Sequence, residues 1–338
     1  MDMRIAGTPA HVVAVEEISQ VGQARRTAQQ LAEGAGFDET DAGRVALVAT
    51  ELASNLLKHG RHGAVYLRCV PGRDAVGVEI LAVDRGPGFD LAQCLPDGVS
   101  SRGTQGIGLG SVMRQAQVFD HYSDERGSVL LARLYPRVLK EQDHRFGAVQ
   151  QSLHDDPACG DSWALTCNGD ALACMVVDGL GHGPDAQVAA HAAIAAFLAS
   201  PFGDPSETLA DAHSAMTGTR GGAVAIARHE RQNGRLRFSG IGNISATLLG
   251  PDSSRGLASH PGIVGVQFRR AHTFDFPQSG GQLLVMHSDG LQSRWRLTDY
   301  PGLWHRHPAV ISAVLHRDFS RGRDDVTVLV IALEAPRG

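Results

Sequence analysis

Apolar runs that stop at an acidic residue recur along the second half of the chain. Residues 173–177 (ACMVV) are apolar and end at Asp178, and three glycines follow before a long stretch of small apolar residues. This order predicts a buried strand, then a tight loop that carries a carboxylate, then a helix over about 186–198. Glycines in such a loop leave the neighbouring backbone carbonyls accessible to a ligand.

Acidic residues also flank three further apolar runs, after the run in one case and before it in two. A second apolar strand over 283–288 ends at Asp289, Asp324 and Asp325 precede a third over 326–331, and Asp161 precedes a fourth over 163–166. Carboxylates gathered at one point repel one another by about 4 kcal/mol per pair at about 4 Å and an effective dielectric of about 20. A hard divalent cation prefers oxygen ligands and neutralises that repulsion. The strand ends therefore predict a metal site.

The remaining segments of the second half predict a β-sandwich flanked by helices. Helices are expected over 206–216 and 309–315, and strands over 222–228, 235–240 and 246–249.

The first half predicts a compact α/β sandwich. Strands are expected over 11–15, 64–70, 76–83 and 129–135, and helices over 21–32, about 39–59 and from about 111 onward. Capping chemistry at Asp38 and Thr40 supports the start of the long helix.

Three features of the first half carry chemistry. Glu51 and Asn55 are four residues apart on the long helix and therefore share a face. Asp84 ends a strand just before two glycines, and the glycine-rich residues 103–110 enter a helix whose free N–H groups can meet phosphates. Each feature alone has a common structural explanation, as a solvated helix face, a turn or a loop.

Composition sets further bounds on the class of protein. The length of 338 residues favours two domains, and a net charge of −5 argues against nucleic acid or an anionic membrane as the main partner. The five cysteines form no CxxC pair, so we expect them to be reduced and mostly buried. The histidines form no zinc-binding pair, and we interpret His287 as structural. Without a signal segment or an apolar run long enough to span a bilayer, we expect a cytoplasmic protein.

The order of the segments GDSW, VVDGLGHG, HSDG and RDDVT resembles the SpoIIE-type branch of the metal-dependent Ser/Thr protein phosphatases, the PPM family, over about 146–333. The resemblance implies hydrolysis of a phosphomonoester with two manganese or magnesium ions, and Asp178, Asp289 and Asp324 as catalytic residues. The metal ligands that it implies are Asp161 (directly or through water), Asp178, the Gly179 carbonyl, Asp289, Asp324 and, in a supporting role, Asp325.

The segments ELASNLLKHG, DRGPG and GIGLGSVMR resemble the GHKL ATPase family, specifically the anti-sigma-factor-type Ser/Thr kinases of bacterial partner switching, over about 12–135. The resemblance implies a Bergerat-type fold that binds ATP with magnesium. Asn55 would hold the magnesium, Asp84 would accept a hydrogen bond from adenine, and Glu51 would be the general base. The lid and phosphate cradle would be formed by Gly86, Gly88, Gly106, Gly108 and Gly110.

Together the two resemblances predict a GHKL-type domain over 1–136, a linker over 137–145 and a PPM-type phosphatase domain over 146–338. The function they imply is dephosphorylation of a STAS-type anti-sigma antagonist in stress-response signalling. Two alternatives stay open for the first domain: it phosphorylates the same partner, or it only binds the partner or senses nucleotide. The sequence leaves open the identity of the substrate, its phosphosite, the downstream sigma factor and the number of chains in the assembly.

Overall fold

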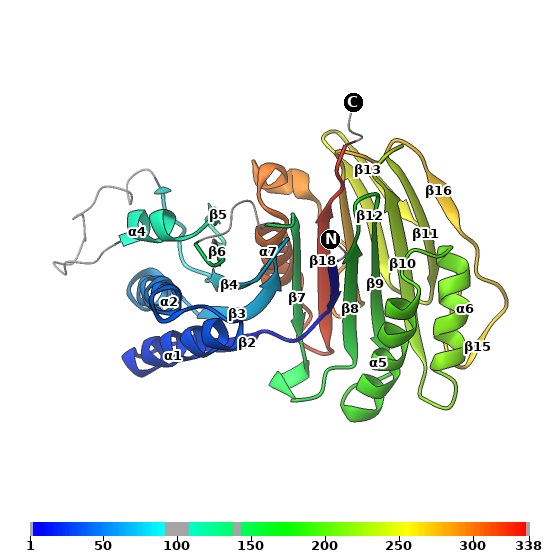
Figure 1. The fold of residues 1–338 in the computed structure, drawn as a ribbon, viewed down its shortest axis with the longest axis horizontal. Coiled ribbons are helices and arrows are strands. Elements are labelled where there is room, and N and C mark those ends of the chain that lie inside the picture. The colour runs from blue at the N-terminus through cyan, green and yellow to red at the C-terminus, as the bar shows by residue number, and fades with distance from the viewer. Residues whose placement is uncertain (1–2, 92–107, 138–142, 336–338) are drawn as a thin grey trace. The chain divides into compact units, whose positions relative to one another are not determined.

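The computed structural model describes residues 3–91, 108–137 and 143–335, which form two compact units (Figure 1). Each unit is discontinuous in sequence. The large unit combines Met1–Pro9, Arg145–Trp304 and Leu315–Gly338, and the small unit combines Ala10–His144 with His305–Val314. Among the described residues, no helix is both long and apolar enough to cross a membrane.

The large unit contains two antiparallel sheets. In spatial order, the first sheet consists of β1 (Met3–Ala6), β8 (Asp161–Cys167), β9 (Ala171–Gly179), β10 (Gly222–Glu230), β11 (Arg235–Ile241) and β16 (Phe274–Phe276). The second consists of β13 (Ser253–Leu257), β12 (Ser245–Gly250), β17 (Leu283–His287), β18 (Val326–Ala332) and β7 (Phe146–Gln151). The strands β14 (Gly262–Ile263) and β15 (Gln267–Phe268) pair separately, and short 3-10 helices lie at Leu153–Asp155, Leu297–Asp299 and Leu303–His305.

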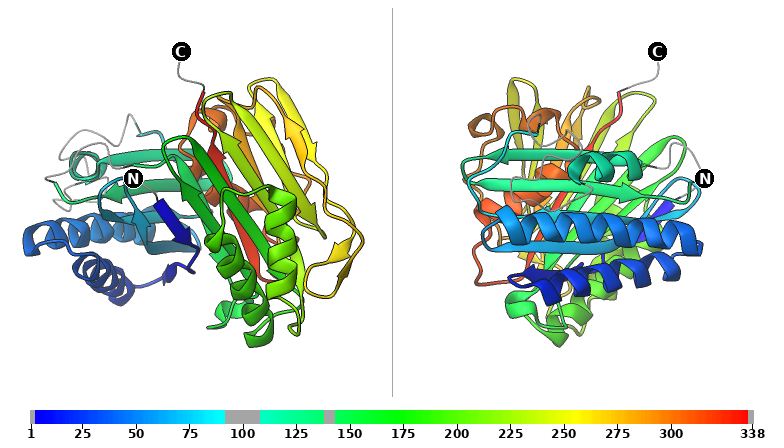
Figure 2. Two further views of the ribbon diagram at one scale, coloured as in Figure 1. Left: turned by 45° about the vertical axis from the view of Figure 1, so that its right-hand side comes forward. Right: turned by 90° about the vertical axis from the view of Figure 1, so that its left-hand side faces the viewer.

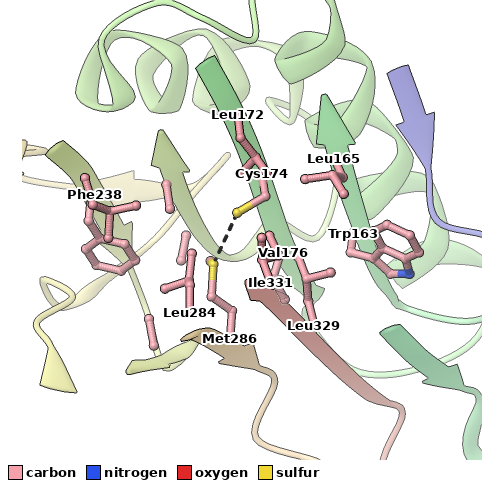
Figure 3. Packing of buried hydrophobic residues seen from close by; sticks show 14 of the residues in the cluster. Trp163, Leu165, Leu172, Cys174, Val176, Phe238, Leu284, Met286, Leu329 and Ile331 are labelled. Atoms are coloured by element: carbon pink, nitrogen blue, oxygen red, sulfur yellow. Dashed lines mark hydrogen bonds between the residues drawn. The ribbon is translucent and has the colours of Figure 1, made fainter. Parts of the chain in front are cut away.

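Strand β9 is buried on both of its faces, which explains its continuous apolar run. Cys174 and Val176 face the core between the two sheets, where the Cys174 thiol lies 3.7 Å from the sulfur of Met286 (Figure 3). Met175 and Val177 face the other way, against α5 (Pro184–Ala199) and α6 (Pro205–Ala215). Because successive side chains of a strand point to opposite faces, one strand joins both cores.

The small unit is a sheet covered on one face by helices (Figure 2). Its strands, in spatial order, are β2 (His11–Val15), β3 (Gly63–Pro71), β4 (Val76–Val83), β6 (Gly127–Leu134) and β5 (Val118–Asp124). The covering helices are α1 (Ile18–Gly34), α2 (Glu39–His59) and α4 (Gly108–Gln115). Helix α2 begins at the N-cap Asp38, whose carboxylate accepts a hydrogen bond from the Asp41 N–H at 2.7 Å.

The opposite face of this sheet carries a buried charge cluster. Arg68, Glu79 and Arg133 are register neighbours on β3, β4 and β6. The Glu79 carboxylate accepts from Arg68 Nε at 2.7 Å and from Arg133 Nε at 2.8 Å. Asp143 binds Arg133 at 2.7 Å and His307 Nε2 at 3.0 Å. The cluster thereby holds the segment 305–314, which includes the start of α7 (Pro308–Phe319), in the small unit.

The expected fold class is confirmed, an α/β sandwich followed by a β-sandwich flanked by helices. The strands β1, β5, β7 and β13 to β16 were not expected, and α4 begins at Gly108 rather than near residue 111. Strand β1 has only four residues, too few to show a period, and it finds its place by pairing with β8. Strand β5 (VFDHYSD) is only partly buried, so its sequence lacks a clear apolar alternation.

Candidate functional site

Three of the expected site carboxylates line one pocket of the large unit. Asp178 lies at the end of β9, Asp289 just after β17 and Asp324 just before β18. All three border a pocket of about 480 Å³, which Asn243 also lines. Segments far apart in sequence therefore bring their carboxylates to one place, as the strand-end pattern predicted.

Asp161 and Asp325 lie behind this pocket rather than on its wall. Asp161 pairs with Asp178 across β8 and β9, is 2% exposed and accepts a hydrogen bond from Ser288 Oγ at 2.5 Å. Asp325 accepts the backbone N–H of Leu153 at 2.7 Å and that of Gly160 at 2.5 Å. Asp325 therefore fixes two backbone segments beside the site, and Asp161 fixes the side chain of Ser288.

Backbone packing at the site requires glycine at two positions. A Cβ atom added at Gly179 would lie 2.4 Å from the carbonyl oxygen of Ala186, at the start of α5. A Cβ atom at Gly222 would lie 2.3 Å from the carbonyl oxygen of Asp178. Any larger residue would push β9 away from the neighbouring segment, so these glycines set the position of Asp178.

The electrostatics of the pocket favour a cation. Burial, together with the charges of Asp289 and Asp324, raises the pKa of Asp178 from 3.8 to about 7. Burial and the neighbouring Asp178 raise the pKa of Asp161 well above its ordinary value, and burial raises that of Asp324. These shifts record the cost of gathering negative charges, and a divalent cation would offset it.

The donors present suit a hard cation, because they are carboxylate and backbone oxygens. Among the residues the structure describes, no group of three His, Cys, Asp or Glu side chains lies close enough together to hold a metal ion by itself. Cations at this pocket would be held by Asp178, Asp289 and Asp324 together with backbone oxygen, water or substrate.

Two polar residues of the site were not identified from the sequence. Asn243 follows β11 and donates from Nδ2 to Asp289 Oδ2 at 2.7 Å. Ser288 donates to Asp161 and accepts the Thr327 N–H at 3.0 Å, which links β17, β18 and β8. The available signal for Ser288 was its place directly before the strand-end Asp289, whereas no acidic residue neighbours Asn243 in the sequence. His287 is buried between the Ser288 carbonyl and Trp295, in agreement with a structural role.

In the small unit, Glu51 and Asn55 lie on α2 and are half-buried. Burial raises the pKa of Glu51, against the opposing charge of Lys58 and a hydrogen bond with the Gly108 backbone. Glu51 thus faces the start of α4, the helix that follows the glycine-rich segment. A carboxylate with a raised pKa is a stronger base than an exposed one.

Two hydrogen bonds with neighbouring backbone groups hold Asp84 at the end of β4. Its N–H donates to the Ser128 carbonyl at 2.9 Å, and its carboxylate accepts from the Gly86 N–H at 2.6 Å. Gly88 has a φ of +77°, and a Cβ there would lie 2.4 Å from the Asp124 carbonyl. Gly108 and Gly110 begin α4, while Gly106 lies outside the described residues.

Comparison with known proteins gives two family matches on this chain. Residues 14–134 match the histidine kinase-like ATPase domain, and residues 168–334 match the stage II sporulation protein E (SpoIIE) family. The serine/threonine-protein kinase RsbT of Bacillus subtilis (strain 168) is 33% identical over 97 residues, which are 28% of this chain and 73% of RsbT.

Solved structures resemble the chain at the level of fold. A chain from a study of the bacterial stressosome as a modular system adapted to control secondary messenger signaling matches with a TM-score of 0.52 and 26% identity. The match covers 56% of this chain and 99% of that one. The chain therefore belongs to the RsbT-like family, and it joins a histidine kinase-like ATPase domain over 14–134 to a SpoIIE-type protein serine/threonine phosphatase domain over 168–334.

Proposed function

We propose that this chain is a two-site regulator of bacterial partner switching. Its phosphatase domain removes phosphate from a Ser or Thr of a STAS-type anti-sigma antagonist, and its ATP-binding domain phosphorylates the same partner. The observation that carries this proposal is that Asp178, Asp289 and Asp324 line one pocket in a chain that also carries an RsbT-like sequence. The functional division we propose is 1–136, a linker over 137–145, and 146–338.

In the phosphatase domain, Asp178, the Gly179 carbonyl, Asp289 and Asp324 would hold two manganese or magnesium ions. Such ions supply positive charge to the phosphoryl oxygens and make a bound water more acidic. Asn243 orients Asp289 through its amide. Behind them, Asp161 and Asp325 position the strand ends through Ser288 and the Gly160 backbone.

In the ATP-binding domain, Asp84 would accept the adenine amino group and Asn55 would hold magnesium beside the phosphates. Gly86, Gly88, Gly108 and Gly110, with Gly106, would form the lid and the phosphate cradle. Glu51 would take the proton from the Ser or Thr hydroxyl of the partner, and its half-buried position supports that role.

A kinase and a phosphatase in one chain act on any partner that is docked on either domain. A short linker gives such a partner an effective concentration that reaches about the millimolar range. Because the two reactions together only consume ATP, we expect partner or nucleotide binding to favour one of them. In the alternative form of the proposal, the first domain binds the partner or senses nucleotide and transfers no phosphate.

Metal dependence tests the phosphatase half of the proposal. Wild-type protein should remove phosphate from a phosphorylated STAS protein only with manganese or magnesium, and Asp289→Asn should abolish turnover. The matched control is Asp211→Asn, which changes an exposed carboxylate on α6 and should retain activity. Full activity of the wild type in excess EDTA would overturn the assignment of this site.

A further inference from the structure

A second pocket of the large unit adjoins the carboxylate pocket. It has a volume of about 450 Å³ and shares Asp289 and Asp324 with the first pocket. Its other lining residues are Gln292, Ser293, Arg294, Arg321 and Arg323. One wall is thus the edge of the candidate metal site, and three arginines contribute to the rest.

The backbone around the arginines is fixed by hydrogen bonds. Arg321 donates its N–H to the Gly290 carbonyl at 2.9 Å, and Gln292 donates to the Phe319 carbonyl at 2.9 Å. Leu291 and Ser320 form an antiparallel bridge between the same two segments. The segment that follows Asp289 and the one that precedes Asp324 are therefore tied together, and both present arginine to the pocket.

These three arginines have no acidic partner at ion-pair distance within the described residues. Other exposed arginines of the same unit are paired, as in Arg220 with Asp185 and Arg235 with Asp275. Even Arg296, close to Arg294 in sequence, lies 3.4 Å from its partner Asp299. The pocket thus carries two carboxylates on the side of the candidate metal site and three guanidinium groups that remain available to bind an anion.

The expected occupant follows from the geometry of the guanidinium group and from the neighbouring site. A planar guanidinium binds a carboxylate through two parallel hydrogen bonds. The phosphoryl group of the substrate is expected in the first pocket, and the shared wall of Asp289 and Asp324 puts residues next to the phosphorylated one within reach of the adjoining pocket. Its volume can hold more than one acidic side chain.

We propose that Arg294, Arg321 and Arg323 form a specificity pocket that binds acidic side chains flanking the phosphorylated residue of the protein substrate. This inference rests on the proposed phosphatase function and adds a substrate class to it. The arginines are not expected to act on the phosphorus atom. Their contribution is to select protein substrates with carboxylates beside the phosphosite.

The test compares two phosphoserine peptides, one with Glu residues on both sides of the phosphoserine and one with Gln in the same places. For full-length wild type with manganese, kcat/KM should be higher for the Glu peptide. The double variant Arg294→Gln/Arg321→Gln should reduce that preference by about tenfold, mostly through KM, as expected for two lost ion pairs. Arg296→Gln, which removes a paired arginine outside the pocket, is the matched control and should keep the preference.

Each other outcome decides a separate question. Equal hydrolysis of the two peptides by the wild type overturns the specificity pocket but leaves the phosphatase proposal standing. If the double variant loses activity on both peptides and on p-nitrophenyl phosphate in the same proportion, the specificity pocket is also overturned. The arginines would then contact the phosphoryl group itself. If the wild type hydrolyses no substrate, the phosphatase proposal fails, and fluorescence anisotropy of the labelled peptides then tests the pocket by itself. Binding of the Glu peptide that depends on the arginines supports the pocket. Equal binding of the two peptides overturns it.

Discussion

Replacing Asp178 by Asn should stabilise the metal-free protein while it destroys metal binding. The pKa of Asp178 is raised from 3.8 to about 7 by burial and by the charges of Asp289 and Asp324. A pKa difference of that size corresponds to about 4 kcal/mol of folding free energy, which is lost when the carboxyl group ionises in the folded protein. Asparagine has nearly the same shape and carries no charge, so it relieves the repulsion and keeps the packing.

The sign follows from proton linkage. Because the folded pKa is raised, the stability associated with the protonated carboxyl is fully present below about pH 4 and is lost as the pH rises through about 7. Metal-free wild type should therefore be less stable than the Asp178→Asn variant by up to about 4 kcal/mol at pH 8. At pH 4 the two proteins should differ little.

Urea denaturation in EDTA, followed by tryptophan fluorescence, measures this difference. All three tryptophans (Trp163, Trp295 and Trp304) belong to the large unit, so the signal reports on the unit that contains Asp178. The exposed Asp211→Asn change is the control and should alter stability little at either pH. Manganese should stabilise the wild type and not the Asp178→Asn variant. If that variant is less stable than the wild type at pH 8 without metal, the reasoning from charge repulsion is wrong.

Two further predictions concern the small unit. Asp84→Asn should weaken ATP binding by about 1.5–3 kcal/mol through one lost charge-assisted hydrogen bond, and Asn55→Ala should remove the magnesium dependence of binding, both measured by calorimetry against wild type. No ATP affinity in the wild type would favour the binding-module alternative. Glu79→Gln should destabilise the small unit by about 3–5 kcal/mol, because it removes the buried negative charge that Arg68 and Arg133 both bind. Urea denaturation followed by far-UV circular dichroism checks this value, and a change below about 1 kcal/mol would contradict it.

The strands that carry the site were predictable because their pattern is local. β9, β17 and β18 are apolar runs bounded by Asp178, Asp289 and Asp324, and burial on both faces makes such runs continuous. The pattern places a carboxylate at each strand end, and in the structure all three aspartates line one pocket. The roles of the individual residues there remain predictions.

The features missed depend on contacts between distant segments. Strand β1 is defined by its pairing with β8, and the link from Ser288 to Asp161 joins residues that no spacing rule relates. Likewise, the charge cluster around Glu79 alternates with the apolar residues of β4, and only the register of three strands shows its partners. Tertiary pairing of this kind leaves no periodic signal in the sequence.

The central claim is that two opposing activities act on one partner, and a pair of variants tests it most directly. Glu51→Ala and Asp178→Asn are each incubated with the same STAS protein, ATP, magnesium and manganese, and the phosphorylated partner is quantified over time. The account predicts that the Asp178→Asn protein accumulates phosphorylated partner and that the Glu51→Ala protein does not. The contrary result is an Asp178→Asn protein that leaves the partner unphosphorylated while the wild type still removes phosphate from a pre-phosphorylated sample. In that case the first domain is a docking or sensing module, and the kinase half of the account is wrong.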